Sequence, residues 1–199
     1  PYHFVHSKLM CWVAVDRGIK LAERLGHTGN IKRWRKTAQD IRDDILSRGW
    51  NPERQAFTQH YDTPALDASN LLMPLYDFLP INDPRVMATI RRTVVELSQN
   101  GLLYRYKNEE VNDGLRGSEG AFLWFSFWIV RNMLRQGKLD DAVVLYEKLL
   151  SYRNHPGLFS EMIDPVSGEA LGNFPQALTH LATIVTGLEL SQALNDEKD

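Results

Sequence analysis

The hydrophobic residues of this chain follow two kinds of helical pattern that alternate along the sequence. In segments such as 4–25, 66–78 and 121–130, apolar side chains occur on all sides of the predicted helix. In segments such as 31–45 and 84–97, they recur every three or four positions and form one stripe. A helix that is apolar all round is contacted on several sides, whereas a single stripe faces one neighbour. The pattern therefore predicts buried helices that alternate with surface helices.

Local signals at the helix ends support this division. Pro74 predicts a kink, and Asp83 before Pro84 predicts an N-cap followed by proline at the first helical position. Gly137 is typical of a residue that ends a helix, and Asp140 is a candidate cap for the next one. We expect seven helices, four buried and three outer, over about 4–25, 31–45, 66–78, 84–97, 121–136, 139–150 and 175–193.

The length of each connection depends on which kind of helix it leaves and which kind it enters. Links from a buried helix to a surface helix are short, whereas links from a surface helix to the next buried one, 49–65, 100–118 and 152–174, are long. Long loops in a compact domain are usually functional. Helical hairpins with every long loop on one rim predict an all-α fold, an α/α toroid, in one domain over 1–199. An α-solenoid shows the same alternation but does not need three long loops on one edge.

Composition narrows the class of protein and its partners. The chain has 199 residues, 43% of them hydrophobic and 24% charged, with a net charge of −2 and both signs interspersed. This charge pattern argues against a nucleic-acid or anionic-membrane surface, and no apolar segment reaches the roughly 20 residues that span a bilayer. We expect a small neutral molecule or another protein as the partner. The single cysteine, Cys11, excludes an internal disulfide and lies in an apolar run, which predicts burial.

The segment 157–180 is the strongest candidate for chemistry. It contains three glycines, two prolines and three carboxylates, and Asp164-Pro-Val-Ser-Gly168 predicts a tight turn that could hold a carboxylate such as Glu161 in place. By spacing alone, a glutamate in a loop is more often a solvated charge than a catalyst. No metal-ligand cluster, phosphate-binding glycine loop or Ser-His-Asp arrangement stands out, so we expect no metal and no cofactor.

Three motifs in the same order resemble the glucoamylase-like glycoside hydrolases of family 15. They are His3-Phe-Val-His-Ser-Lys-Leu-Met-Cys-Trp-Val-Ala-Val-Asp-Arg17, Asp113-Gly-Leu-Arg-Gly-Ser-Glu119-Gly-Ala-Phe-Leu-Trp-Phe-Ser-Phe-Trp128, and the segment 157–180. The resemblance covers essentially the whole chain. It implies about half of an (α/α)6 toroid, and a glucoamylase, glucodextranase or bacterial trehalase activity on an α-glucoside or α-glucan substrate.

The resemblance also implies roles for individual residues. Glu161, in Leu-Phe-Ser-Glu, resembles the general base of the family, and Arg105 resembles the arginine that hydrogen-bonds the sugar at the cleavage point. The family's general acid lies in a Trp-Glu pair shortly before the His-Phe motif. We therefore expect the acid upstream of Pro1, in an N-terminal half of the protein that these residues do not include.

Other candidate residues have both a structural and a functional interpretation. Glu119 is expected to open the helix from 121, where N-terminal capping and sugar contact are equally favoured, and Phe174 is a candidate substrate contact. The remaining candidates are expected to be structural: Asp67 as a helix cap, His180 as a core histidine, and Trp12, Trp34, Trp124 and Trp128 as core residues.

The resemblance implies hydrolysis with inversion, in which an acid and a base lie on opposite sides of the sugar, about 6.5–9.5 Å apart. The alternative is a non-catalytic helical toroid or solenoid that serves as a binding or regulatory module. Seven helices are about half of the twelve in a closed toroid. We therefore expect apolar flanks on the first and last buried helices to face solvent.

Overall fold

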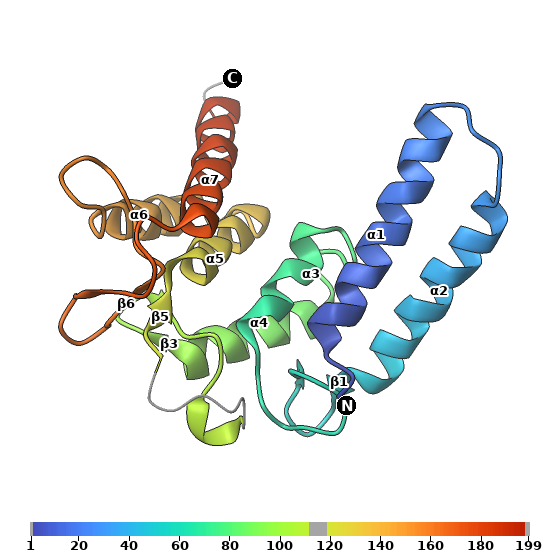
Figure 1. Ribbon diagram of the computed structural model, residues 1–199, viewed down its shortest axis with the longest axis horizontal. Coiled ribbons are helices and arrows are strands. Elements are labelled where there is room, and N and C mark those ends of the chain that lie inside the picture. Colours follow the sequence, from blue (N-terminus) through green and yellow to red (C-terminus); the bar gives the residue numbers. More distant parts are fainter. Residues whose placement is uncertain (1, 112–118, 198–199) are drawn as a thin grey trace. The chain divides into compact units, whose positions relative to one another are not determined.

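A computed structural model of the chain describes residues 2–111 and 119–197 (Figure 1). The chain divides into two compact units, 1–89 and 90–199, within the stretch expected to be one domain. Each unit is described by itself. Helices dominate both, and strands are only two residues long in the described residues, which confirms the all-α class.

The first unit is built on a helical hairpin. Helix α1, Val5–Arg24, packs along α2, Ile31–Arg48, and the two lie side by side in Figure 1. Val5 and Leu9 of α1 and Ile45 of α2 are completely buried, as their helical spacing predicts. Strand β1, Trp50–Asn51, then pairs antiparallel with β2, Ala56–Phe57.

The segment 66–78 is buried as predicted, but it is not one kinked helix. It forms a 3-10 turn, η1, Ala68–Leu71, followed by the single helical turn α3, Leu72–Leu75. Asn70 of η1 donates from Nδ2 to the carbonyls of Phe57 and Thr58, each at 3.0 Å. Pro74 has no N–H to extend a helix. The segment is therefore tied to the loop after β2 instead of forming a longer helix.

The predicted start of the fourth helix is confirmed. Helix α4 spans Pro84–Leu97, and Asp83 Oδ1 accepts a hydrogen bond of 2.9 Å from the backbone N–H of Arg85. The Asp83 carboxylate also binds the Arg85 guanidinium, with Nη2 to Oδ2 at 2.9 Å. This side-chain hydrogen bond is the main cause that lowers the pKa of Asp83 below its usual value.

The second unit contains the remaining helices and two small sheets. Strands β3, Ser98–Gln99, and β4, Leu102–Leu103, form a hairpin. A three-stranded antiparallel sheet has the order β5-β6-β7. The other elements are η2, Asn108–Glu110; β5, Ala121–Phe122; α5, Leu123–Arg135; α6, Leu139–Leu150; β6, Met162–Ile163; β7, Ala170–Leu171; and α7, Ala177–Asp196.

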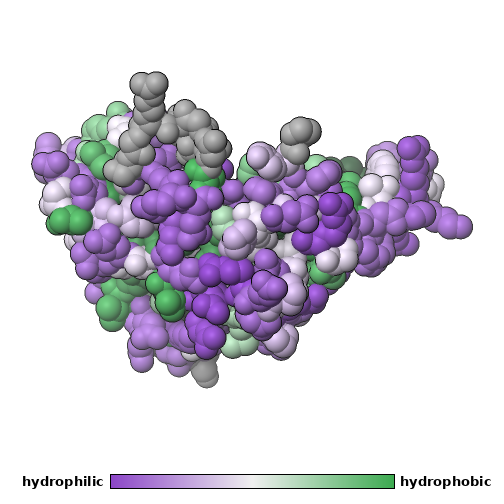
Figure 2. Space-filling model, turned by 90° about the horizontal axis from the view of Figure 1, so that it is seen from below, coloured by the Kyte–Doolittle hydropathy of each residue, from purple (hydrophilic) through white to green (hydrophobic). Residues whose placement is uncertain are grey.

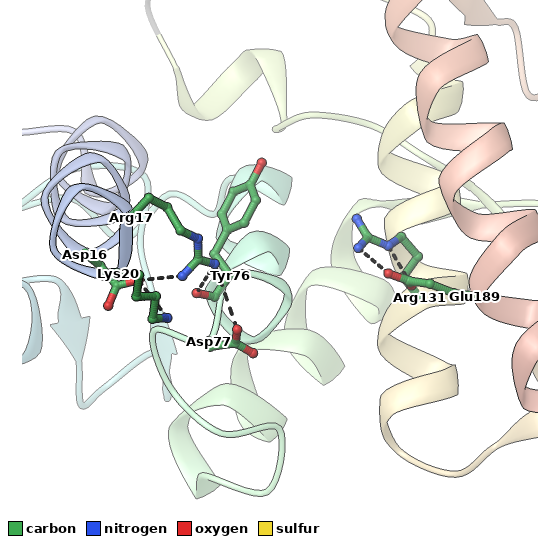
Figure 3. Close-up of polar contacts among 7 residues, drawn as sticks. All are labelled: Asp16, Arg17, Lys20, Tyr76, Asp77, Arg131 and Glu189. Carbon is green, nitrogen blue, oxygen red and sulfur yellow. Dashed lines mark hydrogen bonds and ion pairs between the residues drawn. The ribbon is translucent and has the colours of Figure 1, made fainter. Parts of the chain in front are cut away.

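Helix α5 is the centre of this unit, and it packs against both α6 and α7. Phe127 and Val130 of α5 are completely buried. Figure 3 shows an ion pair that joins α5 to α7, in which Arg131 Nε and Nη2 bind the Glu189 carboxylate at 2.8 and 2.6 Å. The bidentate pair of Arg131 and Glu189 fixes the relative register of the two helices.

Within the first unit, Figure 3 also shows Arg17 Nη2 donating to the Tyr76 carbonyl at 3.1 Å.

Two helix boundaries in this unit differ from the prediction. Helix α5 begins at Leu123 and not at Ala121, because Ala121 and Phe122 pair with Ile163 and Met162 as strand β5. Lys138, not Asp140, is the N-cap of α6, so Asp140 lies in the first turn. Gly137, at φ +71°, follows the end of α5 as predicted.

The expected apolar flanks are present on α1 and α7. Leu21 and Leu25 at the end of α1 are 58% and 61% exposed, and Leu181 and Leu188 on α7 are 59% and 67% exposed. Figure 2 shows one face of the molecule, on which hydrophobic patches lie among a mainly hydrophilic surface.

Two residues predicted to be buried are not. Cys11 is exposed because the buried face of α1 carries Leu9 and Trp12, and helical spacing puts Cys11 on another face. Trp34 on α2 is 37% exposed. Trp12 is buried, as predicted, and its ring packs edge-to-face on Phe78 at a centroid distance of 5.0 Å. Among the described residues, no helix is both long enough and apolar enough to cross a membrane.

We predict that Asp83→Ala lowers the free energy of unfolding by about 1 kcal/mol, because it removes a helix cap. Asp83→Asn is the matched control, since it keeps the cap and removes the charge. The pKa of Asp83 is lowered in the folded state, so its contribution is present above about pH 4 and is lost as the pH falls through the folded value. Urea unfolding of the whole protein at pH 7 and pH 3 measures both effects. Equal stability of the Ala and Asn variants at pH 7 would contradict the cap.

Candidate active site

The segment 157–180 contains the predicted tight turn, and the structure shows that this turn joins the two strands of a β-hairpin that the sequence did not predict. Strand β6 pairs with β7, and the Gly168 N–H donates to the Asp164 carbonyl at 2.8 Å. Asp164 Oδ1 accepts from the backbone N–H groups of Val166 and Ser167 at 2.7 and 3.2 Å. These two backbone donors hold the pKa of Asp164 below its usual value. The turn is therefore fixed by its own carboxylate.

One edge of the hairpin is attached to the start of α5. Strand β6 pairs with β5, and the Leu123 N–H, at the first residue of α5, donates to the Glu161 carbonyl at 3.3 Å. Since α5 is the most deeply buried helix of its unit, the backbone of Glu161 is held by the core. The backbone of Glu161 is therefore more restricted in position than that of a glutamate in a mobile surface turn.

The residues just before Glu161 are attached to the start of α7. Thr179 Oγ1 donates to the Ser160 carbonyl at 3.0 Å, and the Gln176 N–H donates to the Phe159 carbonyl at 2.9 Å. His180 Nε2 accepts from the Phe159 N–H at 3.4 Å, while its Nδ1 donates to the Gln176 carbonyl at 2.7 Å. His180 is half-buried and also packs on the Phe159 ring at 5.5 Å. The sequence predicted a core histidine but not these bonds.

Asn173 holds the Glu161 carboxylate, and no sequence pattern predicted this pair. Oε2 of Glu161 accepts from the backbone N–H of Asn173 at 2.9 Å and from its Nδ2 at 2.7 Å. The Glu161 N–H donates in return to the Asn173 carbonyl at 2.9 Å. No residue in 2–111 or 119–197 donates a hydrogen bond to Oε1 of Glu161. One oxygen of the carboxylate is therefore anchored by Asn173, and the other accepts no hydrogen bond from the described residues.

Gly172 lets the carboxylate come this close to the backbone. It has φ +75°, and a Cβ placed there would lie 2.8 Å from Oε2 and 2.9 Å from the Cβ of Glu161. Both the backbone conformation and the close approach favour glycine at this position. Phe174, two residues later and 53% exposed, follows Asn173 on the same stretch.

Arg105 follows strand β4, and the Tyr104 N–H donates to the Leu97 carbonyl at 2.9 Å. Arg105 is exposed, and its guanidinium carbon lies 5.1 Å from the centroid of the Tyr106 ring. Tyr106 itself is buried. The guanidinium thus lies near the Tyr106 ring on an exposed residue, and its chemistry suits the binding of a ligand hydroxyl.

Glu119 does not open the helix as expected, because α5 begins four residues later, at Leu123. Glu119 instead lines a cavity of about 490 Å³ together with Tyr104, Tyr106 and the turn at Asp164. Burial and the charge of Asp164 raise the pKa of Tyr104 above its usual value. Among the described residues, the structure brings Glu119 and Tyr104 to this cavity, whereas Glu161 is not one of its lining residues.

The candidates expected to be structural are mostly so. Asp67 caps η1 by accepting the Ser69 N–H at 2.8 Å. Trp124 and Trp128 are half-buried and pack on Phe125 at 5.5 and 5.0 Å. Within the part of the chain that the structure describes, no three His, Cys, Asp or Glu side chains cluster as metal ligands would.

Comparison with known proteins gives one family. Residues 1–188 match the family described as Glycosyl hydrolases family 15. A trehalase of Mycolicibacterium smegmatis is 48% identical over 184 residues, and one of Mycobacterium tuberculosis is 50% identical over 184 residues. Each alignment covers 92% of this chain and 27% of the relative. A trehalase of Thermoplasma acidophilum is 39% identical, over 97% of this chain and 33% of its own length.

Solved structures show the same fold. A wild-type glycosidase superposes with a TM-score of 0.80 at 15% identity, over 96% of this chain and 52% of its own. A variant of a glycosidase in complex with glucose superposes with a TM-score of 0.80 at 14% identity, with the same coverage. The similarity confirms the predicted fold class, all-α and about half of an (α/α)6 toroid. The chain spans about a third or less of the length of the three trehalases.

We predict that Gly172→Ala destabilises the protein more than Gly168→Ala does. Gly168 has nearly the same φ, +76°, but a Cβ there meets nothing within 4 Å, so this variant carries only the backbone strain, about 1 kcal/mol. Gly172→Ala adds an overlap with the Glu161 carboxylate, which costs about 1–3 kcal/mol more. Urea unfolding of the two variants of the whole protein measures the difference. Equal stabilities would show that the carboxylate does not lie against Gly172.

Proposed function

This chain belongs to glycosyl hydrolase family 15, and on that basis we propose that it carries the general base and part of the sugar site of an inverting α-glucoside hydrolase. The observation that supports this most directly is the geometry of Glu161. Asn173 holds one of its carboxylate oxygens through two hydrogen bonds, and the backbone of Glu161 is anchored to the starts of α5 and α7.

In the proposed mechanism, Glu161 accepts a proton from a water molecule as that water attacks the anomeric carbon. An acid on the opposite side of the sugar protonates the leaving oxygen, so the configuration inverts. We propose that this acid lies outside the 199 residues, since the matched trehalases are about three times as long as this chain or more. Arg105 would donate to sugar hydroxyls, and Glu119 and Phe174 would contact the substrate nearby.

Trehalose is the substrate that we propose among the α-glucosides. Relatives with 48% and 50% identity are named trehalase, and their similarity extends over 92% of the chain. Trehalose has two α-linked glucose units joined through their anomeric carbons. Inversion at one unit therefore releases one β-glucose, while the leaving unit remains α-glucose.

We predict that Glu161→Gln lowers the kcat of the full-length enzyme by about 10²–10⁴-fold, with KM little changed, because the amide keeps the shape but cannot accept the proton. Trehalose, maltose and isomaltose are the substrates to compare. Proton NMR of the first products distinguishes inversion, with equal α- and β-glucose from trehalose, from retention, with α-glucose alone. Wild-type turnover by the variant would exclude Glu161 as the base, and α-glucose alone would exclude inversion.

For Arg105→Lys we predict a fall of roughly tenfold in kcat/KM, shared between a higher KM and a lower kcat. The charge remains, but the paired donors of the guanidinium are lost. Arg153→Lys is the matched control, because Arg153 is another exposed arginine of the same unit, in the loop after α6. Steady-state kinetics on trehalose measure both. If Arg105→Lys and Arg153→Lys have the same kinetic constants, Arg105 does not bind the sugar.

A further inference from the structure

The contact between Asn173 and Glu161 has a consequence for how the base works. Both donors of Asn173 reach the same oxygen, Oε2, at 2.7 and 2.9 Å. These lengths are those of charge-assisted hydrogen bonds to a carboxylate. Two donors occupy Oε2, so its lone pairs are directed at the protein. Oε1 accepts from no donor in 2–111 or 119–197, and we infer that it is the oxygen that interacts with a water molecule.

We propose that Asn173 is a positioning residue that selects Oε1 of Glu161 as the proton-accepting oxygen, an inference that rests on the proposed function. The two hydrogen bonds resist rotation of the carboxylate about its terminal bond. A base that is held within a narrow range of orientations loses less freedom as it aligns with its water. Asn173 does not need to touch the substrate for this role.

The side chain and the backbone of Asn173 make separate hydrogen bonds to Glu161, so a substitution can remove the first without the second. Its N–H and carbonyl both bond to Glu161, and these backbone bonds persist whatever the side chain is. Asn173 is exposed, so its side chain fills no core space. A substitution at Asn173 therefore removes one hydrogen bond to Oε2 and leaves the hairpin in place.

The test compares Asn173→Asp, Asn173→Ala and Glu161→Gln in the full-length enzyme. Asn173→Asp keeps the shape of the side chain, but its carboxylate has no donor for Oε2. We expect kcat on trehalose to fall by about 10- to 100-fold in both Asn173 variants, as loss of a hydrogen bond to a charged group predicts, with KM changed by less than about threefold. The matched control is Asn154→Ala, because Asn154 lies in the same long loop, 152–174, and its side chain accepts from the Leu158 N–H and not from a group of Glu161. Its kcat should remain close to that of the wild type.

A second measurement distinguishes positioning of the base from damage to the loop. In Glu161→Ala, added azide can attack the anomeric carbon without losing a proton, so the rescued reaction needs no base. If Asn173 acts only through Glu161, adding Asn173→Ala leaves the azide-rescued rate unchanged. If azide gives no rescue, the residual rates of Glu161→Gln with and without Asn173→Ala serve the same purpose and should be equal.

Each outcome decides between the proposals. Wild-type kcat in the Asn173 variants, with Glu161→Gln inactive, would overturn the positioning role and leave the base assignment intact. A fall in the azide-rescued or residual rate on adding Asn173→Ala would also overturn it, because the residue would then act on the loop or the substrate. Wild-type kcat in Glu161→Gln would overturn the proposed function itself.

Discussion

The burial of α5 is the constraint on which the second unit depends. Phe127 and Val130 are completely buried, and both α6 and α7 pack on this helix. Because α5 is apolar on nearly all faces, it can be stable only when other elements surround it. The N-terminus of α5 is therefore held in place by the core, and it restricts the motion of the strands and loops that are hydrogen-bonded to it.

The proposed active site uses this rigidity through backbone hydrogen bonds. The carbonyl of Glu161 meets the first residue of α5, while Ser160 and Phe159 bond to the start of α7. The loop is thus hydrogen-bonded to the starts of two helices, and the candidate base, Glu161, belongs to the part of the loop that these bonds hold. Functional residues on loops are precise only when a packed scaffold fixes the loop ends.

The carboxylates of this unit have different surroundings, which give them different roles. Asp164 is bound by the backbone of its own turn and stabilises the hairpin. Glu189 is paired with Arg131 and joins two helices. Glu161 has one oxygen bound and one without a donor among the described residues. An acceptor that retains an oxygen for a water molecule is the one suited to act as a base.

The sequence by itself determined most of the helices, the cap at Asp83, the end of α5 before Gly137 and, through its resemblance to a family, the candidate Glu161. These features are local, because helical spacing and capping depend on residues a few positions apart. Only the tertiary structure decided that α5 begins at Leu123 and that Asn173 lies against Glu161. Both results come from the pairing of β5, β6 and β7, which joins segments that are separate in the sequence. The hydrophobic pattern contains no signal for such a register, because strands of two residues are too short to show an alternation.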